Sequence, residues 1–133
     1  MFTTYFLNVA AGNLFGSQTI PAIPSIYYLG LSTTAPQLDG TGVTEPSGNA
    51  YARVAITALG APSGGVCVST ADLNFPRSTG DWGTITHYAI FDQATGGNLL
   101  IYGTLSPQRS VEVATVMSIE AGSLELAIEN ATV

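Results

Sequence analysis

The sequence predicts an all-β domain built from antiparallel strands, a β-sandwich or jelly-roll-like fold, with one short helix near the N-terminus. Roughly seven short apolar segments are separated by Gly- and Pro-containing turns at intervals of about 8–12 residues, as in sandwiches and barrels. The 133 residues match the commonest domain size. Since no internal repeat or change of composition marks a boundary, we expect residues 1–133 to form a single domain.

The N-terminal segment is the one part of the chain with helical spacing. Apolar residues recur at intervals of three and four between Thr3 and Phe15 and predict a helix there, with Thr3 or Thr4 as its N-cap. Gly12 and Gly16 limit its length.

The later apolar segments have strand length and are rich in β-branched and aromatic residues. A turn at 94–98 joins two of them as a hairpin. The predicted strands are residues 25–31, 51–59, 67–75, 84–92, 99–105, 111–115 and 124–128.

Alternation predicts which faces of these strands are buried. In strand 84–92 the odd-numbered residues from Ile85 to Phe91 share one face, and the even-numbered residues share the other. Both sets contain apolar side chains, so we expect both faces to be partly covered. In the last strand the even-numbered residues from Leu124 to Ile128 are expected to face inward.

Residues 32–50 form a long connection without periodicity. Such a loop in a compact domain is usually functional or packed on a neighbour. We therefore expect this loop and the N-terminal segment, residues 1–24, to make the contacts of an assembly.

Arg53 stands between two apolar neighbours in a predicted strand, and the chain has only three basic residues. We expect Arg53 to be a structural cation that pairs with a carboxylate, Glu45 or Asp92, or with loop carbonyls.

Composition excludes several classes of function. Only 9% of the residues are charged, against about 25% in an average protein, and nine carboxylates face three arginines and no lysine. Binding to nucleic acid or to anionic membranes needs clustered cations, so neither is expected. A surface with so few charges is typical of one that is covered in its working state. We expect a homo-oligomer, a trimer, or docking in several copies on other subunits.

The chain lacks a basic N-terminal region and a long apolar run, so we predict neither a signal peptide nor a transmembrane helix. The protein is expected to remain in the compartment where it is made. The single cysteine, Cys67, cannot form an intrachain disulfide, and its apolar neighbours predict a buried thiol.

No catalytic, cofactor-binding or metal-binding residue is assigned. A nucleophile–base pair would need His87, the only histidine, and no Gly-x-Ser-x-Gly turn is present. One histidine and one cysteine offer no zinc spacing. The carboxylate pairs Asp81 with Asp92 and Glu125 with Glu129 are interpreted as solvated turn and strand residues rather than a glycosidase dyad.

Trp and Tyr side chains are the usual platforms for contacts with sugars or proteins. Trp82 lies in a turn before a strand and is expected to pack in the core rather than reach outward. The strand tyrosines are expected at the core or its rim. They are Tyr27, Tyr28, Tyr51, Tyr88 and Tyr102.

Four blocks in order carry a family resemblance: YLGLSTTAP at 28–36, EPSGNAYARV at 45–54, WGTITHYAIFD at 82–92 and GGNLLIYG at 96–103. They resemble small virion proteins of tailed bacteriophages commonly labelled tail fibre proteins, and the resemblance spans roughly residues 26–126.

The resemblance implies a non-enzymatic structural component of the virion, made in the host cytoplasm and assembled in several copies through contacts with other virion proteins. It leaves two locations open, a tail-fibre module and a capsid decoration protein that cements the head as a trimer. Two further hypotheses stand beside it. A carbohydrate- or receptor-binding module would show clustered exposed aromatics and amides, and a hydrolase would need His87 beside a carboxylate in a pocket.

Overall fold

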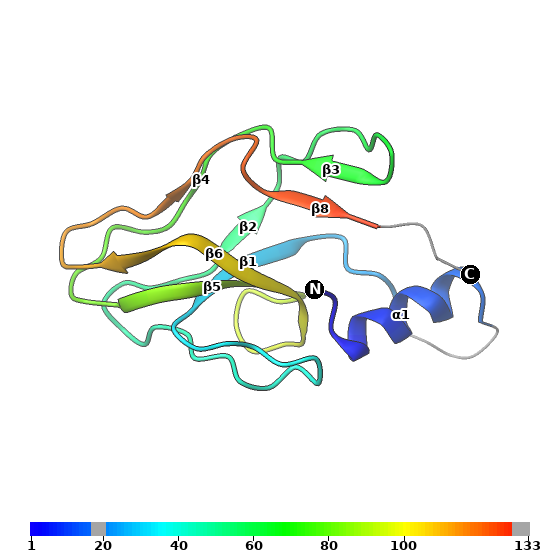
Figure 1. Ribbon diagram of the computed structural model, residues 1–133, viewed down its shortest axis with the longest axis horizontal. Helices are drawn as coiled ribbons and strands as arrows, with labels where there is room; N and C mark the ends of the chain where they lie inside the picture. Colours follow the sequence, from blue (N-terminus) through cyan, green and yellow to red (C-terminus); the bar gives the residue numbers. More distant parts are fainter. Residues whose placement is uncertain (17–20, 129–133) are drawn as a thin grey trace.

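The computed structural model describes residues 1–16 and 21–128, whose backbone forms one helix and eight strands (Figure 1). The prediction of an all-β domain with one short N-terminal helix is confirmed. The elements are α1 (Thr4–Leu14), β1 (Tyr27–Ser32), β2 (Val54–Ile56), β3 (Val66–Val68), β4 (Leu73–Asn74), β5 (Gly83–Phe91), β6 (Leu99–Val111), β7 (Ser118–Ile119) and β8 (Glu125–Ala127).

Four strands form the main sheet, in the order β2-β1-β5-β6, and every neighbouring pair is antiparallel. The chain start extends this sheet at its β6 edge, because Phe2 bridges Ile101 and the backbones of Met1 and Tyr102 are hydrogen-bonded in both directions. Two antiparallel ribbons, β3-β8 and β4-β7, form the opposing layer of the sandwich, above the sheet in Figure 1.

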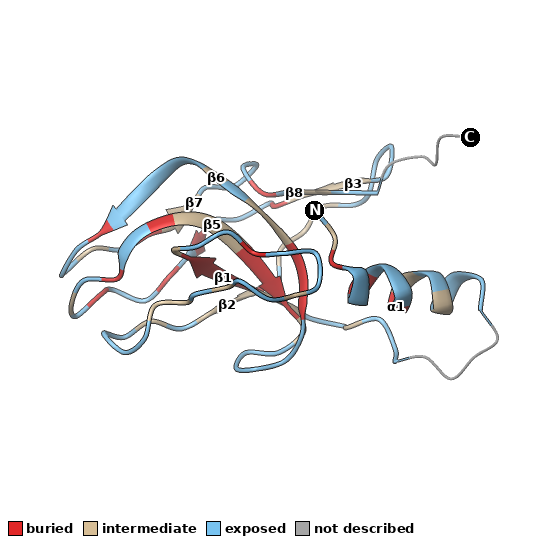
Figure 2. Ribbon diagram, turned by 60° about the horizontal axis from the view of Figure 1, so that its bottom comes forward, coloured by how far each residue is buried: buried red, intermediate tan, exposed pale blue. Residues whose placement is uncertain are grey.

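The main core lies between the sheet and the ribbons, and buried positions cluster on β1, on β5 and on the neighbouring part of β6 (Figure 2). Trp82 is only 5% exposed and donates a hydrogen bond to the Asn49 carbonyl, so its predicted core position is confirmed. The ribbon layer contributes Leu73, Phe75, Met117 and Leu124, and the sheet contributes Leu29, Leu31, Ile85, Ile90, Leu100 and Ile101.

The outer face of the sheet is covered as well, as predicted for strand 84–92. Ala89, Phe91 and Leu99 form a second buried cluster, against which Val43 from the loop after β1 and Tyr102 pack. The loop of residues 33–53, called here the covering loop, therefore closes the face that the ribbons leave open.

The predicted faces of strand 84–92 were wrong at one end. A register shift between Ile85 and His87 marks a β-bulge in the pairing with β6. Ile85 consequently packs in the main core with Ile90, whereas Ala89 and Phe91 lie on the other face. The partner of Ile85 is Arg109 and that of His87 is Thr104, so the regular pairing is interrupted here, and periodicity alone does not reveal such an interruption.

Predicted strand 67–75 is two strands in the structure. β3 pairs with β8 and β4 pairs with β7, so the chain crosses from one ribbon to the other between them. The buried Ser69 fixes this crossing, because its backbone amide donates to the Leu124 carbonyl and its hydroxyl accepts from the Gly122 and Leu124 amides.

Predicted strand 111–115 does not form. β6 continues to Val111, and the chain then turns through Ala114, which has a φ of 62°. The Ser78 hydroxyl holds this turn, donating to the Glu112 carbonyl and accepting from the Thr115 amide. Val113 is 60% exposed as a result.

Two predicted burials were also wrong. Ile128, predicted to face inward, is 72% exposed, although Leu124 is buried and Leu126 packs on the core. Cys67 is partly rather than fully buried, because β3 belongs to a two-stranded ribbon with one open face. No helix among the described residues is long and apolar enough to cross a membrane.

Candidate functional site

The N-terminal helix is attached to the sheet through Thr3, which is fully buried. The Thr3 amide donates to the Leu100 carbonyl at 2.9 Å, and its hydroxyl donates to the Leu99 carbonyl at 2.7 Å. The same hydroxyl accepts from the Phe6 amide at 3.3 Å, so Thr3 is the N-cap of α1. One side chain therefore ends an edge strand and begins a helix.

Helix α1 buries only one side. Phe6 and Val9 are buried, and α1 extends beyond the end of the sheet (Figure 1). Leu7, Leu14 and Phe15 are 49%, 67% and 87% exposed. The first charged side chain of the sequence is Asp39, so nothing on α1 carries a charge. The helix thus exposes apolar side chains without charged neighbours on the same segment.

An apolar groove lies between the start of α1 and the β3-β8 ribbon, with a cavity volume of about 290 Å³. None of the described residues that line it is charged. The Cys67 thiol belongs to this groove, where burial is partial. Its other lining residues include Phe2, Phe6, Tyr27, Leu59, Pro62, Ile101, Leu126 and Ile128.

The covering loop contains a buried ion pair. Arg53 donates to both carboxylate oxygens of Glu45, at 2.9 Å from Nε and 2.7 Å from Nη2. Its Nη1 donates to the carbonyls of Gln93 and Gly96 at 2.7 Å each. The guanidinium carbon lies 3.4 Å from the centroid of the Phe91 ring, and the Arg53 side chain is 6% exposed.

This arrangement confirms the predicted role of Arg53 and identifies Glu45, not Asp92, as its partner. Asp92 accepts hydrogen bonds from the backbone amide and side chain of Asn98 and thereby closes the β5–β6 turn. Arg53 also binds two carbonyls of that turn, so it connects the covering loop to the β5–β6 hairpin.

Tyr51 completes the cluster around Glu45. Its hydroxyl donates to the Glu45 carboxylate at 2.7 Å and accepts from the Leu31 amide at 2.9 Å. Burial by itself raises the pKa of Glu45, but hydrogen bonds from Arg53 and Tyr51 and the Arg53 charge outweigh it and hold that pKa below its ordinary value. Burial, together with the Glu45 carboxylate, raises the pKa of the Tyr51 hydroxyl.

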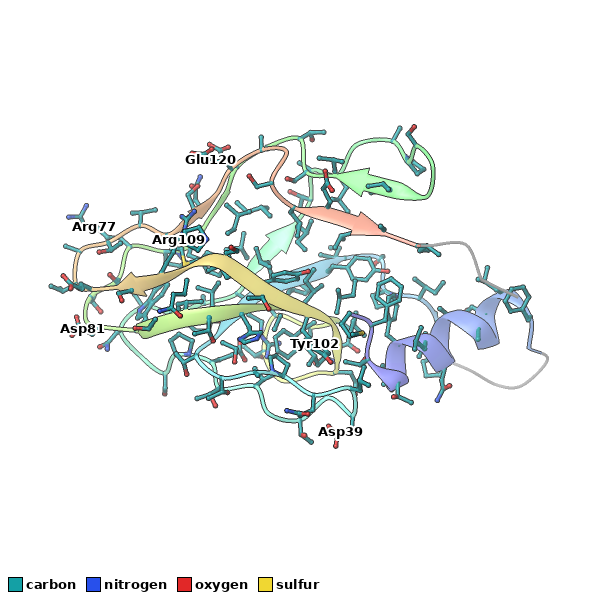
Figure 3. All side chains as sticks on the ribbon, viewed as in Figure 1. Asp39, Arg77, Asp81, Tyr102, Arg109 and Glu120 are labelled. Atoms are coloured by element: carbon teal, nitrogen blue, oxygen red, sulfur yellow. The ribbon has the colours of Figure 1, made fainter. Side chains whose placement is uncertain are left out.

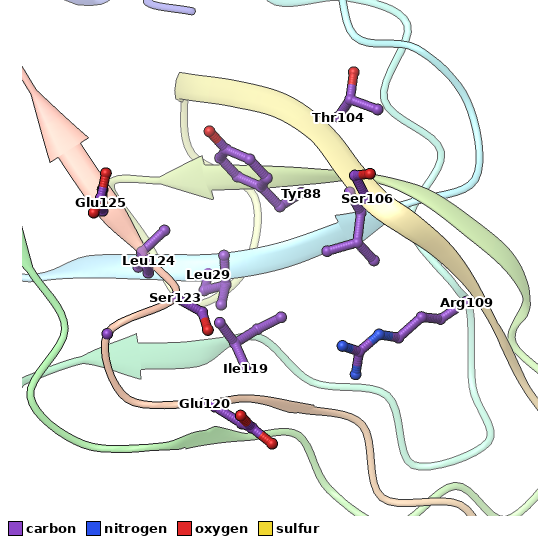
Figure 4. Close-up of a pocket in the computed structure, with 12 residues that line it drawn as sticks. Leu29, Tyr88, Thr104, Ser106, Arg109, Ile119, Glu120, Ser123, Leu124 and Glu125 are labelled. Carbon is purple, nitrogen blue, oxygen red and sulfur yellow. The ribbon is translucent and has the colours of Figure 1, made fainter.

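A second pocket, of about 480 Å³, opens between the sheet and the ribbons on the side of β6 (Figure 4). Both polar and apolar side chains line this pocket. The Arg109 guanidinium points into it, and one of its nitrogens donates to the Ser118 carbonyl at 3.2 Å. Burial raises the pKa of the Tyr88 hydroxyl. Glu120, Ser123, Glu125, Thr104 and Ser106 add polar groups, and Leu29, Ile119 and Leu124 add apolar ones.

The residues weighed for catalysis are not brought together. His87 Nδ1 lies 2.8 Å from the hydroxyl of the adjacent Thr86, and among the described residues no carboxylate is a hydrogen-bond partner of its ring. Asp81 and Asp92 flank the nine-residue strand β5 at opposite ends. Within residues 1–16 and 21–128, no group of three His, Cys, Asp or Glu side chains could hold a metal ion. Glu129 lies outside the described residues.

The sequence did not reveal either pocket. The polar one depends on residues of β6 facing the segment 119–125, and the groove depends on residues near the chain start facing β8. Both juxtapositions are long-range. The absence of charge before Asp39 was the one available sign of the uncharged end.

A model of a known protein family matches most of the chain. No curated protein matches the chain. The model of one family, described as podophage GP4 fiber I protein gp80, matches residues 1–127. This range covers the helix, the sheet and both ribbons. The chain therefore belongs to the family of the podophage GP4 fiber I protein gp80, a phage fibre family and hence a family of phage structural components.

Proposed function

We propose that this protein is a non-enzymatic structural module of a phage fibre, present in several copies, a trimer being expected, and joined to its neighbours through its uncharged end. The observation that carries the proposal is the pairing of exposed apolar residues on α1 with an apolar groove beside it. An exposed apolar surface of this kind marks a contact site.

The proposal assigns the protein to the tail side of the virion rather than to the head, and its family supports this choice. Synthesis takes place in the host cytoplasm, and its partners are other virion proteins. The N-terminal segment 1–24, of which residues 17–20 lie outside the described residues, is the assembly segment. Neither nucleic acid nor a membrane is a partner, which agrees with a net charge of −6.

Purified particles test this function. Subunit-resolution imaging should place several copies of the chain in a fibre, and quantitative mass spectrometry should count them. Particles that contain no copies, or copies bound only to the head shell, would contradict the proposal.

Receptor binding is a second candidate function, and the polar pocket favours it. Saccharide hydroxyls both donate and accept hydrogen bonds, and the pocket offers donors from Arg109 and acceptors from Glu120 and Glu125 beside the Tyr88 ring. The described residues do not form the exposed cluster of aromatics and amides that was expected for such a module. Their exposed aromatic side chains, Tyr5 and Phe15, lie at α1.

Titration calorimetry against host surface oligosaccharides tests this second function. Binding should be lost in Arg109→Ala and kept in Arg77→Ala, since Arg77 is an exposed arginine outside the pocket lining. Equal binding by both variants would exclude the pocket as the receptor site.

A further inference from the structure

We infer that the C-terminal end of α1, Leu14 and Phe15, docks in the apolar groove of a second copy of the chain. The inference rests on the proposed function, because it requires several copies to meet. It names the two surfaces of the contact and makes them different from each other.

The first surface protrudes. Phe15 is 87% exposed and Leu14 is 67% exposed, at the tip of a helix that extends beyond the sheet (Figure 3). The charged residues labelled in Figure 3 all lie away from this tip. Exposure of an apolar phenyl ring to water is unfavourable, so burying the ring in an apolar site lowers the free energy.

The second surface is hollow and matches the first in chemistry. The groove has a volume of about 290 Å³, and the residues of 1–16 and 21–128 that line it are all uncharged. Ile128, 72% exposed, also lines it. A partner with charges would leave them desolvated and unpaired here, which is costly. The helix tip, with no charged side chain before Asp39, brings none.

A copy cannot fill its own groove with its own helix tip. Phe2 and Phe6 form one wall of the groove, and Phe15, the C-cap of α1, lies nine residues beyond Phe6. At 1.5 Å per residue, the tip is about 13 Å further along the axis of a rigid helix. The contact must therefore form between copies. Since it joins two different patches, it is heterologous and can close into a ring such as a trimer.

Complementation between two variants tests the inference. Phe15→Glu replaces the protruding phenyl ring with a charge, and Ile128→Glu places a charge in the groove. Both positions are so exposed that the fold should be unchanged. Analytical ultracentrifugation should show wild-type oligomers, and each variant alone should associate roughly 100-fold more weakly. The mixture should form 1:1 heterodimers, because the intact helix of one variant fits the intact groove of the other.

Val113→Glu is the matched control. Val113 is also apolar and 60% exposed, but it lies beyond the end of β6 that is distant from α1 (Figure 1). Its oligomers should equal those of the wild type.

Cys67 supplies an independent readout, because it lines the groove and is the only cysteine. Maleimide should label it slowly in wild-type oligomers and at least about tenfold faster in the Phe15→Glu monomer. If the chain's own residues 129–133 filled the groove instead, Cys67 would stay protected in that monomer and become reactive only after their deletion, which would overturn the inference.

The remaining outcomes are also decisive. A monomeric wild type, unchanged association of Phe15→Glu, or a mixture that fails to form heterodimers would overturn the docking. Copies counted in purified particles would still stand in each of these cases, so failure of the docking and failure of the proposed function are distinguishable.

Discussion

The covering loop and helix α1 both lie outside the strands of the sandwich, yet they differ in how their side chains are satisfied. The loop is polar and closed on itself. The Ser32 hydroxyl accepts from the Thr44 amide at 3.0 Å, and the Thr33 amide donates to the Thr44 carbonyl. Arg53 binds the Glu45 carboxylate and two carbonyls of the β5–β6 turn. Helix α1 carries no charged side chain, and Leu14 and Phe15 at its C-terminal end are 67% and 87% exposed.

This difference separates two regions that the sequence analysis had treated as equivalent contact surfaces. A polar loop without periodicity need not seek a partner if its own hydroxyls and carbonyls are paired, and in the described residues no buried side-chain nitrogen or oxygen lacks a hydrogen bond. Leu14 and Phe15, in contrast, remain largely exposed to solvent in the single chain. The contacts of the loop lie within its own domain, whereas the contact between copies that we propose uses the helix.

The largest expected effect is on the loop side. Arg53→Ala leaves the Glu45 carboxylate and two turn carbonyls without their donor, and breaking a buried pair in this way costs about 3 kcal/mol or more. Chemical denaturation should show this loss. The stability of Arg53→Lys should lie between those of the wild type and Arg53→Ala, because one ammonium group cannot make all the hydrogen bonds of the guanidinium. The exposed Arg77→Ala is the control. A melting temperature unchanged by Arg53→Ala would contradict the buried-pair account.

Gly30→Ala should have the next largest effect. A methyl group at Gly30 would lie 2.9 Å from the Glu45 carboxylate and 3.1 Å from the Tyr51 hydroxyl, so it would push the ion pair off the sheet. We expect a loss of about 1–3 kcal/mol. In a Glu45→Ala background the same substitution should cost less, since the clashing carboxylate is gone. Equal costs in both backgrounds would show that the two residues are not coupled.

Only part of the fold and of the ion-pair cluster could be predicted from the sequence. The Arg53–carboxylate pair followed from the scarcity of cations and from the apolar neighbours of Arg53. The short helix and the hairpin at 94–98 followed from local periodicity and turn residues. The register shift between β5 and β6, the division of 67–75 between two ribbons and both pockets depend on pairing with distant segments. No local pattern encodes those partners.

A smaller effect is expected from pH. The pKa of Glu45 is lower in the folded protein than its ordinary value of 4.5, so the ion pair contributes stability above about pH 4.5 and loses it as the pH falls through the folded-state pKa. The denaturation midpoint of the wild type should fall with acidification in that range. Glu45→Gln should be less stable at neutral pH and show a flatter dependence on pH. An identical pH slope in the two proteins would rule out Glu45 as the source.

The smallest effect is expected at His87, which lies in strand β5 and belongs to neither region. Its ring nitrogen Nδ1 lies 2.8 Å from the Thr86 hydroxyl, and no carboxylate of the described residues is hydrogen-bonded to the ring. His87→Ala should assemble into particles as the wild type does, measured by infectivity and by copies per particle. A specific loss of an enzymatic activity in a well-folded variant would contradict the non-enzymatic function.

Hydrogen–deuterium exchange tests the contrast between loop and helix most directly. Exchange should be compared between wild-type oligomers and the Phe15→Glu monomer. The account predicts that amides of the covering loop, residues 33–53, exchange equally slowly in both, whereas α1 and the groove strands β3 and β8 lose protection in the monomer. Loss of protection in the loop, or unchanged protection at α1 and the groove, would contradict it.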